Sequence, residues 1–166
     1  MKAGCADLIL QGLKEAGVSI VCTLPDSYLE EVYRKVAADP DFEHVGVTNE
    51  WEGASIAAGV WLTGKRAALI MENSGLRVAT EPLARLGLTH GIPVVMLMGY
   101  RGDVGEDQWY AIPHGITMEP LLHALRIPYV IVRREGEIKR AILNAYKTAD
   151  NSKYHVAVAF SGEIAQ

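Results

Sequence analysis

Glu50 is the residue of this 166-residue chain whose type and position most suggest chemistry. It follows Asn49, a good helix N-cap, and Glu52 stands at the spacing that completes a capping box. Glu52 therefore has a structural role that Glu50 does not need. A positioned carboxyl group can take part in acid–base chemistry. The alternative for Glu50 is a favourable interaction with the helix dipole.

A second run, Asn73-Ser74-Gly75, joins an apolar segment to a helical pattern. A Ser-Gly turn beside helix N–H groups can hold an anion, although an ordinary strand-to-helix turn explains it equally well. The sequence contains neither a P-loop nor a strand followed by G-x-G-x-x-G, so a dinucleotide site is not expected.

The third segment is a long predicted loop over 99–116, which offers Arg101, Gln108 and His114 as polar groups. Compact domains seldom keep so long a loop without a use. Trp109 could serve there as a lid or an interface anchor. The alternative for His114 is a loop histidine that only makes local hydrogen bonds.

These segments must be positioned by alternating short strands and helices, which predict an α/β fold. Because such alternation is typical of parallel sheets, we expect an open three-layer arrangement, with helices on both faces of a mostly parallel six-stranded sheet. Residues 1–166 should form a single domain, with its ligand at the carboxyl ends of the strands. The expected strands are 20–24, 44–48, 67–71, 93–98, 129–132 and 155–160, and the expected helices are 3–16, 27–38, 50–63, 77–88, 117–125 and 136–149.

The composition of the chain excludes several classes of protein function. A net charge of −4 and a pI near 5.7 argue against nucleic-acid or basic membrane-surface binding. No apolar run is long enough to span a membrane. Cys5 and Cys22 lie in apolar stretches without metal-ligand spacing, so we expect reduced core thiols, no metal site and a cytoplasmic location. The mean hydropathy of +0.10 favours an oligomer.

Several motifs together resemble a known family, the pyrimidine-binding (Pyr) domain of thiamine-diphosphate-dependent decarboxylases. Within that family the whole chain is most similar to the alpha subunits of sulfopyruvate decarboxylases, and next to phosphonopyruvate decarboxylases. The motifs are Asn49-Glu50 with Gly53-Ala54, Ala57 and Gly59, then Asn73-Ser74-Gly75-Leu76, Leu24-Pro25-Asp26-Ser27, Tyr100-Arg101-Gly102, Gly105-Glu106, Pro113, Gly115 and the run from Thr117 to Leu122.

The resemblance implies that Glu50 hydrogen-bonds the aminopyrimidine ring of thiamine diphosphate and activates the cofactor, which then promotes loss of CO₂ from a small 2-oxo acid. It also implies cofactor contacts from Pro25 and from the Asn73, Ser74 and Gly75 turn. His114 is the second catalytic candidate. The candidates for binding the substrate are Arg77, Arg101, Gln108 and His114.

One motif of the family is missing from this sequence. These enzymes hold the diphosphate and Mg²⁺ through a Gly-Asp-Gly motif that ends in paired asparagines, and Gly102-Asp103-Val104 does not continue in that way. The resemblance therefore implies a separate beta subunit that carries this motif. We expect a hetero-oligomer with additional contacts between copies of this chain.

Arg77, Glu81 and His114 depart from the family pattern, so the substrate is expected to be sulfopyruvate or a different small 2-oxo acid. Two other functions stay open. A Pyr domain that has lost catalysis would only support a partner, although the retained Glu50 argues against it. A flavodoxin-like binding or regulatory module would explain the alternating elements but not the segment around Glu50.

Overall fold

The computed structural model describes residues 2–164, and its strands form one six-stranded sheet in which all neighbours are parallel. The strand order is β2-β1-β3-β4-β6-β5. Parallel neighbours need long crossover connections, and the helices between the strands supply them. The strands are β1 (Val18–Thr23), β2 (Glu43–Gly46), β3 (Arg66–Glu72), β4 (Val95–Gly99), β5 (Tyr129–Val132) and β6 (Val156–Phe160).

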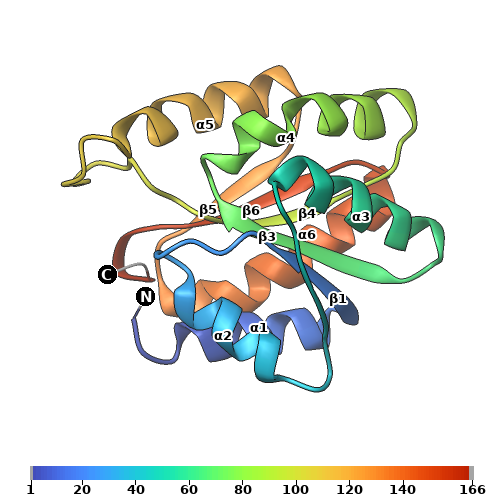
Figure 1. Ribbon diagram of the computed structural model, residues 1–166, viewed down its shortest axis with the longest axis horizontal. Helices are drawn as coiled ribbons and strands as arrows, with labels where there is room; N and C mark the ends of the chain where they lie inside the picture. Colours follow the sequence, from blue (N-terminus) through green and yellow to red (C-terminus); the bar gives the residue numbers. More distant parts are fainter. Residues whose placement is uncertain (1, 165–166) are drawn as a thin grey trace.

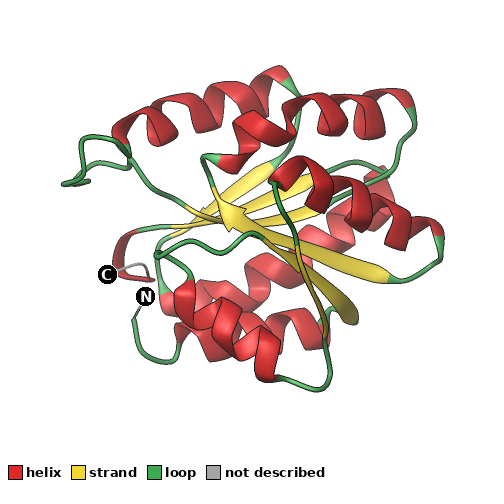
Figure 2. Ribbon diagram, in the orientation of Figure 1, coloured by secondary structure: helices red, strands yellow, loops and turns green. Residues whose placement is uncertain are grey.

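Helices cover both faces of the sheet, as Figure 1 and Figure 2 show. Successive residues of β3 point to opposite faces, so Ala68 and Ile70 join one core whereas Leu69 and Met71 join the other. The predicted three-layer α/β fold is confirmed. One face carries α1 (Cys5–Glu15), α2 (Glu30–Ala38) and α6 (Ile138–Ser152), and the other carries α3 (Glu50–Leu62), α4 (Gly75–Leu83) and α5 (Ile112–Ala124).

The predicted loop over 99–116 is shorter than expected, because α5 begins at Ile112 and not at Thr117. Pro113 lies in the first turn of this helix, where its missing N–H removes no hydrogen bond and its fixed φ suits the helix. His114 therefore stands on the first turn of a helix and not in a loop, which fixes its backbone.

The helix expected over 77–88 begins earlier, at Gly75, and changes after Leu83 into a π-helix, Ala84–Thr89. His155, fully buried before β6, donates from Nε2 to the Leu83 carbonyl oxygen at 2.8 Å. Its Nδ1 accepts the backbone N–H of Val94 at 2.9 Å. A side-chain donor at a helical carbonyl is typical of places where the α-helical ladder is interrupted.

Small residues let α3 lie close to the sheet. Leu69 of β3 fills the space beside Gly53, where an added Cβ would be 2.6 Å from Leu69 Cδ1. Leu69 of the same chain thus packs against α3 at Gly53, whereas Gly59 on the same helix is exposed. Of the helices that the structure describes, none is long and apolar enough to cross a membrane. Cys5 and Cys22 are buried free thiols.

Candidate active site

Glu50 is the first residue of α3, and neighbouring residues already satisfy the helix terminus. The Asn49 side chain accepts the backbone N–H of Glu52 at 2.9 Å, as predicted. Glu52 differs from the expected capping box, because its carboxylate accepts the backbone N–H and the hydroxyl of Thr48 at 2.7 and 2.8 Å. These bonds lower the pKa of Glu52. Glu50 is thus not needed as a cap.

Glu50 is a buried residue, with 8% of its surface exposed. Within residues 2–164, no other side chain forms a hydrogen bond with it. Burial raises the pKa of Glu50, the negative charges of Glu72 and Asp26 raise it further, and its own backbone N–H partly opposes the shift. A buried carboxyl group with a raised pKa at the edge of a sheet is a candidate for proton transfer.

The turn before α4 contacts Glu50 directly. A Cβ added to Gly75 would lie 2.4 Å from Cγ of Glu50, so only glycine leaves room for this carboxyl group. Ser74 precedes Gly75 and makes no capping bond with its side chain. The structure therefore places the predicted Ser-Gly turn and Glu50 at one location.

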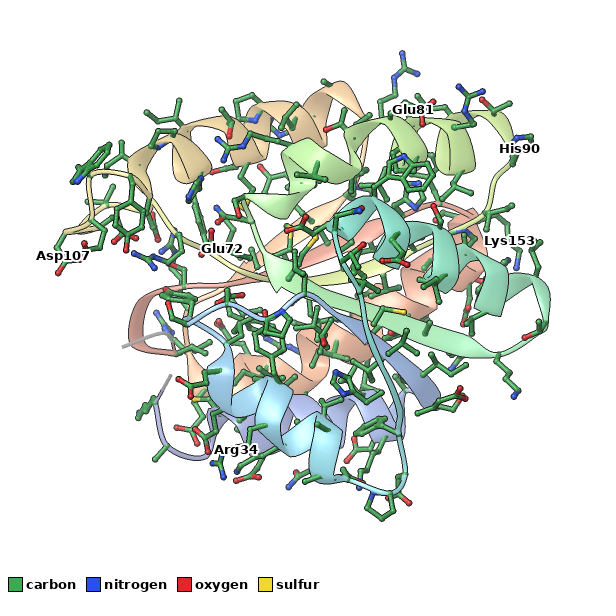
Figure 3. The ribbon with its side chains drawn as sticks, in the orientation of Figure 1. Arg34, Glu72, Glu81, His90, Asp107 and Lys153 are labelled. Carbon is green, nitrogen blue, oxygen red and sulfur yellow. The ribbon has the colours of Figure 1, made fainter. Side chains whose placement is uncertain are left out.

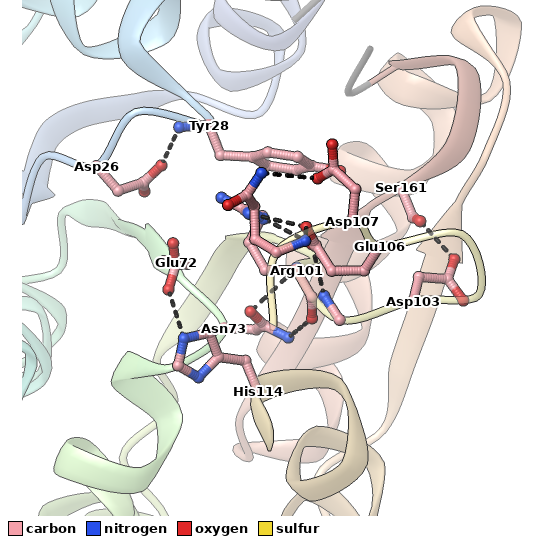
Figure 4. A network of polar contacts seen from close by, with 12 residues as sticks. Asp26, Tyr28, Glu72, Asn73, Arg101, Asp103, Glu106, Asp107, His114 and Ser161 are labelled. Atoms are coloured by element: carbon pink, nitrogen blue, oxygen red, sulfur yellow. Dashed lines mark hydrogen bonds and ion pairs between the residues drawn. The ribbon is translucent and has the colours of Figure 1, made fainter. Parts of the chain in front are cut away.

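Asn73 connects this turn to the segment after β4. Its side-chain amide donates to the Arg101 carbonyl oxygen at 2.9 Å and accepts the Arg101 backbone N–H at 3.1 Å (Figure 4). Asn73 is 1% exposed, and both polar atoms of its amide have partners. The predicted site residue Asn73 thus holds two strand ends together.

Arg101 organises the loop that follows β4. Its guanidinium group donates to both carboxylate oxygens of Glu106, at 2.7 and 2.9 Å, which lowers the pKa of Glu106 to about 2. The same group lies over the rings of Tyr28 and Tyr110, at 5.4 and 5.9 Å from their centroids. The charge of Arg101 is therefore neutralised inside the loop. Gln108 donates its backbone N–H to Glu106 as well.

Two glycines set the position of this loop against α5. Gly102 has a φ of +79°, which favours glycine, and its carbonyl oxygen would be 1.9 Å from a Cβ placed on Gly115. The start of the loop and the first turn of α5 are thus packed backbone against backbone. This contact carries His114 to the carboxyl end of β3.

His114 joins two other residues in a short chain of polar contacts. Arg77 donates from its guanidinium group to Nδ1 of His114 at 2.8 Å. On the other side of the ring, Nε2 lies 3.5 Å from Oε1 of Glu72, the last residue of β3 (Figure 4). Two of the three departures from the family pattern, Arg77 and His114, are therefore bonded to each other. Figure 3 shows Glu72 between the helical layers, whereas Glu81 and His90 lie on the outer surface.

Pro25 and Asp26 lie beyond the carboxyl end of β1. Pro25 is exposed. Asp26 accepts the backbone N–H groups of Tyr28 and Leu29 at 2.5 and 3.0 Å and also the hydroxyl of Tyr33, so it caps the turn that leads to α2.

Sequence reasoning missed Glu72 and Asp26 as neighbours of Glu50. The available signal was their position at strand ends, because the carboxyl ends of parallel strands share one edge. In the described part of the chain, no group of three His, Cys, Asp or Glu side chains is arranged to hold a metal ion.

Comparison with solved structures supports the fold. In a solved structure of 2-oxoglutarate:ferredoxin oxidoreductase from Magnetococcus marinus, a region covering 29% of that chain superimposes on 97% of this one, with a TM-score of 0.76. The sequence identity is 18%, so this likeness establishes the fold alone.

Similar sequences add the family. The sulfopyruvate decarboxylase subunit alpha of Methanothermobacter thermautotrophicus is 35% identical over 86% of both chains. The same subunit of Methanococcus maripaludis is 30% identical over 92% of both chains. The phosphonopyruvate decarboxylase of Streptomyces viridochromogenes is 42% identical over 62% of this chain and 26% of its own length.

The family described as "Thiamine pyrophosphate enzyme, N-terminal TPP binding domain" matches residues 4–118. This range contains Glu50, the Asn73-Ser74-Gly75 turn, the loop after β4 and His114. The chain therefore belongs to the thiamine pyrophosphate enzymes, as a member of their N-terminal, TPP-binding domain family.

Proposed function

We propose that this chain is a single Pyr-type domain that acts as the alpha subunit of a two-chain, thiamine-diphosphate-dependent decarboxylase. The observation that carries the proposal is Glu50, a buried residue at the start of α3, in the motif whose resemblance implies the activating glutamate. The substrate is a small 2-oxo acid, either sulfopyruvate or a close analogue. The names of the relatives support this substrate class.

The residues around Glu50 fit the cofactor. A carboxyl group shielded from water, with a raised pKa, favours its protonated form and suits a basic ring nitrogen as its partner. When bound, thiamine diphosphate supplies the nucleophilic carbon and the electron sink for loss of CO₂. Glu50 would hold and move the proton at its carboxyl oxygen, and Gly75 leaves that oxygen its space. Pro25, Asn73, Ser74 and Gly75 would line the cofactor site.

The remaining site residues have different expected roles. Histidine is the side chain that most readily exchanges protons near neutral pH, so His114 is the second candidate catalytic residue. Arg101 and Gln108 are bonded to Glu106 and are expected to shape the substrate side of the site through the loop. Arg77 and His114 are the candidates for direct contact with the substrate.

A separate beta subunit would supply the diphosphate-binding motif and hold Mg²⁺, because this sequence lacks that motif. Exposed apolar side chains on α3, α4, α5 and the loop before α5 support a partner here, because these three helices cover the same face of the sheet. We expect a hetero-oligomer with contacts between copies of this chain as well. The buried free thiols support a cytoplasmic location. The exposed apolar residues are Trp51, Val78, Trp109, Tyr110, Ile112 and Ile116.

The proposal is tested by producing the chain together with a beta subunit that carries the Gly-Asp-Gly motif, and by measuring CO₂ release from several 2-oxo acids. We expect decarboxylation only when both chains, thiamine diphosphate and Mg²⁺ are present. Calorimetry should detect no thiamine diphosphate binding to this chain alone. A complex that binds the cofactor but releases no CO₂ would favour a non-catalytic Pyr domain, and flavin binding by the isolated chain would favour a flavodoxin-like module.

A further inference from the structure

Several arginines lie near the carboxyl edge of the sheet, and two of them are already neutralised. Arg101 forms two hydrogen bonds with the carboxylate of Glu106. Arg133, which follows β5, is paired with Asp103. Arg77 differs, because among the side chains that the structure describes it has no carboxylate partner. Among the described side chains, Arg134 also lacks a carboxylate partner, but it follows the edge strand β5, whereas Arg77 lies on the helix whose first residue contacts Glu50.

His114, the hydrogen-bond partner of Arg77, does not neutralise the positive charge of Arg77. A guanidinium group can only donate, so Nδ1 of His114 must accept, and the ring proton then lies on Nε2. Nε2 faces Glu72, whose carboxylate favours a proton at this position. A neutral imidazole orients Arg77 without cancelling its charge, whereas a carboxylate in the same place would cancel it.

Arg77 is also accessible. It is exposed, and it lines an open hollow of about 420 Å³ between α4 and α5 together with Thr80, Ile116 and Leu121. Its helix begins at Gly75, the residue that contacts Glu50. The first turn of α4 therefore carries both Arg77 and the glycine that contacts the carboxyl group that we assign to proton transfer.

We propose that Arg77 binds the second anionic group of the 2-oxo acid, and that His114 and Glu72 are positioning residues that orient its guanidinium group. This inference rests on the proposed function. The substrate class is a short 2-oxo acid with a sulfonate, phosphonate or carboxylate at its far end. The planar guanidinium group suits such groups because it forms two parallel hydrogen bonds with their oxygens.

The test uses the complex of both chains and compares two kinds of substrate. Sulfopyruvate and phosphonopyruvate carry the second anion, whereas 2-oxobutanoate is similar in size and lacks it. Arg77→Met should raise KM for the two dianionic acids by about 10- to 100-fold, the usual value of a hydrogen bond to a charged group, and should leave kcat and the KM for 2-oxobutanoate within about 2-fold. Arg77→Lys should recover part of the loss.

Arg85→Met is the matched control, because Arg85 is exposed on the following π-helix and paired with Glu81. It should not change either KM. A binding measurement supports the kinetics: 3-sulfopropanoate, which lacks the oxo group, should inhibit the wild-type complex and bind Arg77→Met weakly. Equal changes in KM for both kinds of substrate, or no change, would overturn the inference. A wild-type complex that decarboxylates none of these acids would instead contradict the proposed function.

Positioning by His114 has its own readout. His114→Asn keeps an oxygen acceptor near the place of Nδ1, so KM for the dianionic acids should stay close to the wild-type value. His114→Leu removes the acceptor and should raise KM for the dianionic acids more than it raises KM for 2-oxobutanoate. If both variants lower kcat for every acid, His114 transfers a proton and does not position Arg77.

Discussion

The carboxyl group of Glu50 fills the space in which any side chain at position 75 would stand. A Cβ on Gly75 would lie 2.4 Å from Cγ and 2.5 Å from Oε1 of Glu50. Two segments that are separate in sequence, the start of α3 and the start of α4, are thus in contact through the proposed catalytic group.

Gly75→Ala should displace Glu50 and reduce decarboxylation by about 100-fold, because misplacement by about 1 Å is costly in an active site. The overpacking should destabilise the chain by about 1–3 kcal/mol. Gly59→Ala on the exposed side of α3 is the control, since an added Cβ there meets nothing within 4 Å. That variant should keep its activity and gain up to about 1 kcal/mol. Equal activity of the two variants would show that the contact with Glu50 has no catalytic importance.

The ionised form of Glu50 should also lower the free energy of unfolding at neutral pH. Its pKa is raised in the folded chain, so the neutral carboxyl favours folding below the unfolded pKa of about 4.3, and this contribution is lost as the pH rises through the folded pKa. Urea unfolding at pH 7 should therefore find Glu50→Gln more stable than the wild type. At pH 4 the difference should largely disappear. A Gln variant less stable than the wild type at pH 7 would mean that the charged form has a stabilising partner.

His155 predicts the opposite pH dependence in a different range. Burial lowers its pKa, so its contribution to stability is fully present above the unfolded pKa of about 6.5 and declines as the pH falls toward the folded pKa. The urea concentration at the midpoint of unfolding should therefore decrease as the pH is lowered from 7.5 to 5.5. His155→Gln should show a smaller decline while being less stable at pH 7.5. An identical decline in both proteins would assign the effect to other groups.

The sequence contained enough information to predict the six strands and the cap at Asn49, because both depend on local patterns. The start of α5 lies five residues before the predicted Thr117, at Ile112, where Pro113 favours the first turn of a helix. Strands and helix caps can be predicted because the residues that determine them are close together in the sequence.

Contacts across the sheet could not be predicted in the same way. Glu72 and His114 are far apart in sequence and meet because β3 ends where Gly102 and Gly115 pack the start of α5. The pairing of Arg101 with Glu106, which removes a free cation from the predicted substrate side, likewise depends on the shape of one loop. Such contacts are set by tertiary packing and leave no periodic signal in the sequence.

The central claim is that Glu50 moves a proton during the reaction, and the most direct measurement is the decarboxylation rate of Glu50→Gln in the complex of both chains. Gln keeps the shape of the side chain but cannot exchange the proton, so the rate should fall by about 10²- to 10⁴-fold while the complex still assembles. Glu52→Gln, which alters the neighbouring cap, should retain most of the rate. A Glu50→Gln complex that works at half the wild-type rate or faster would contradict the account.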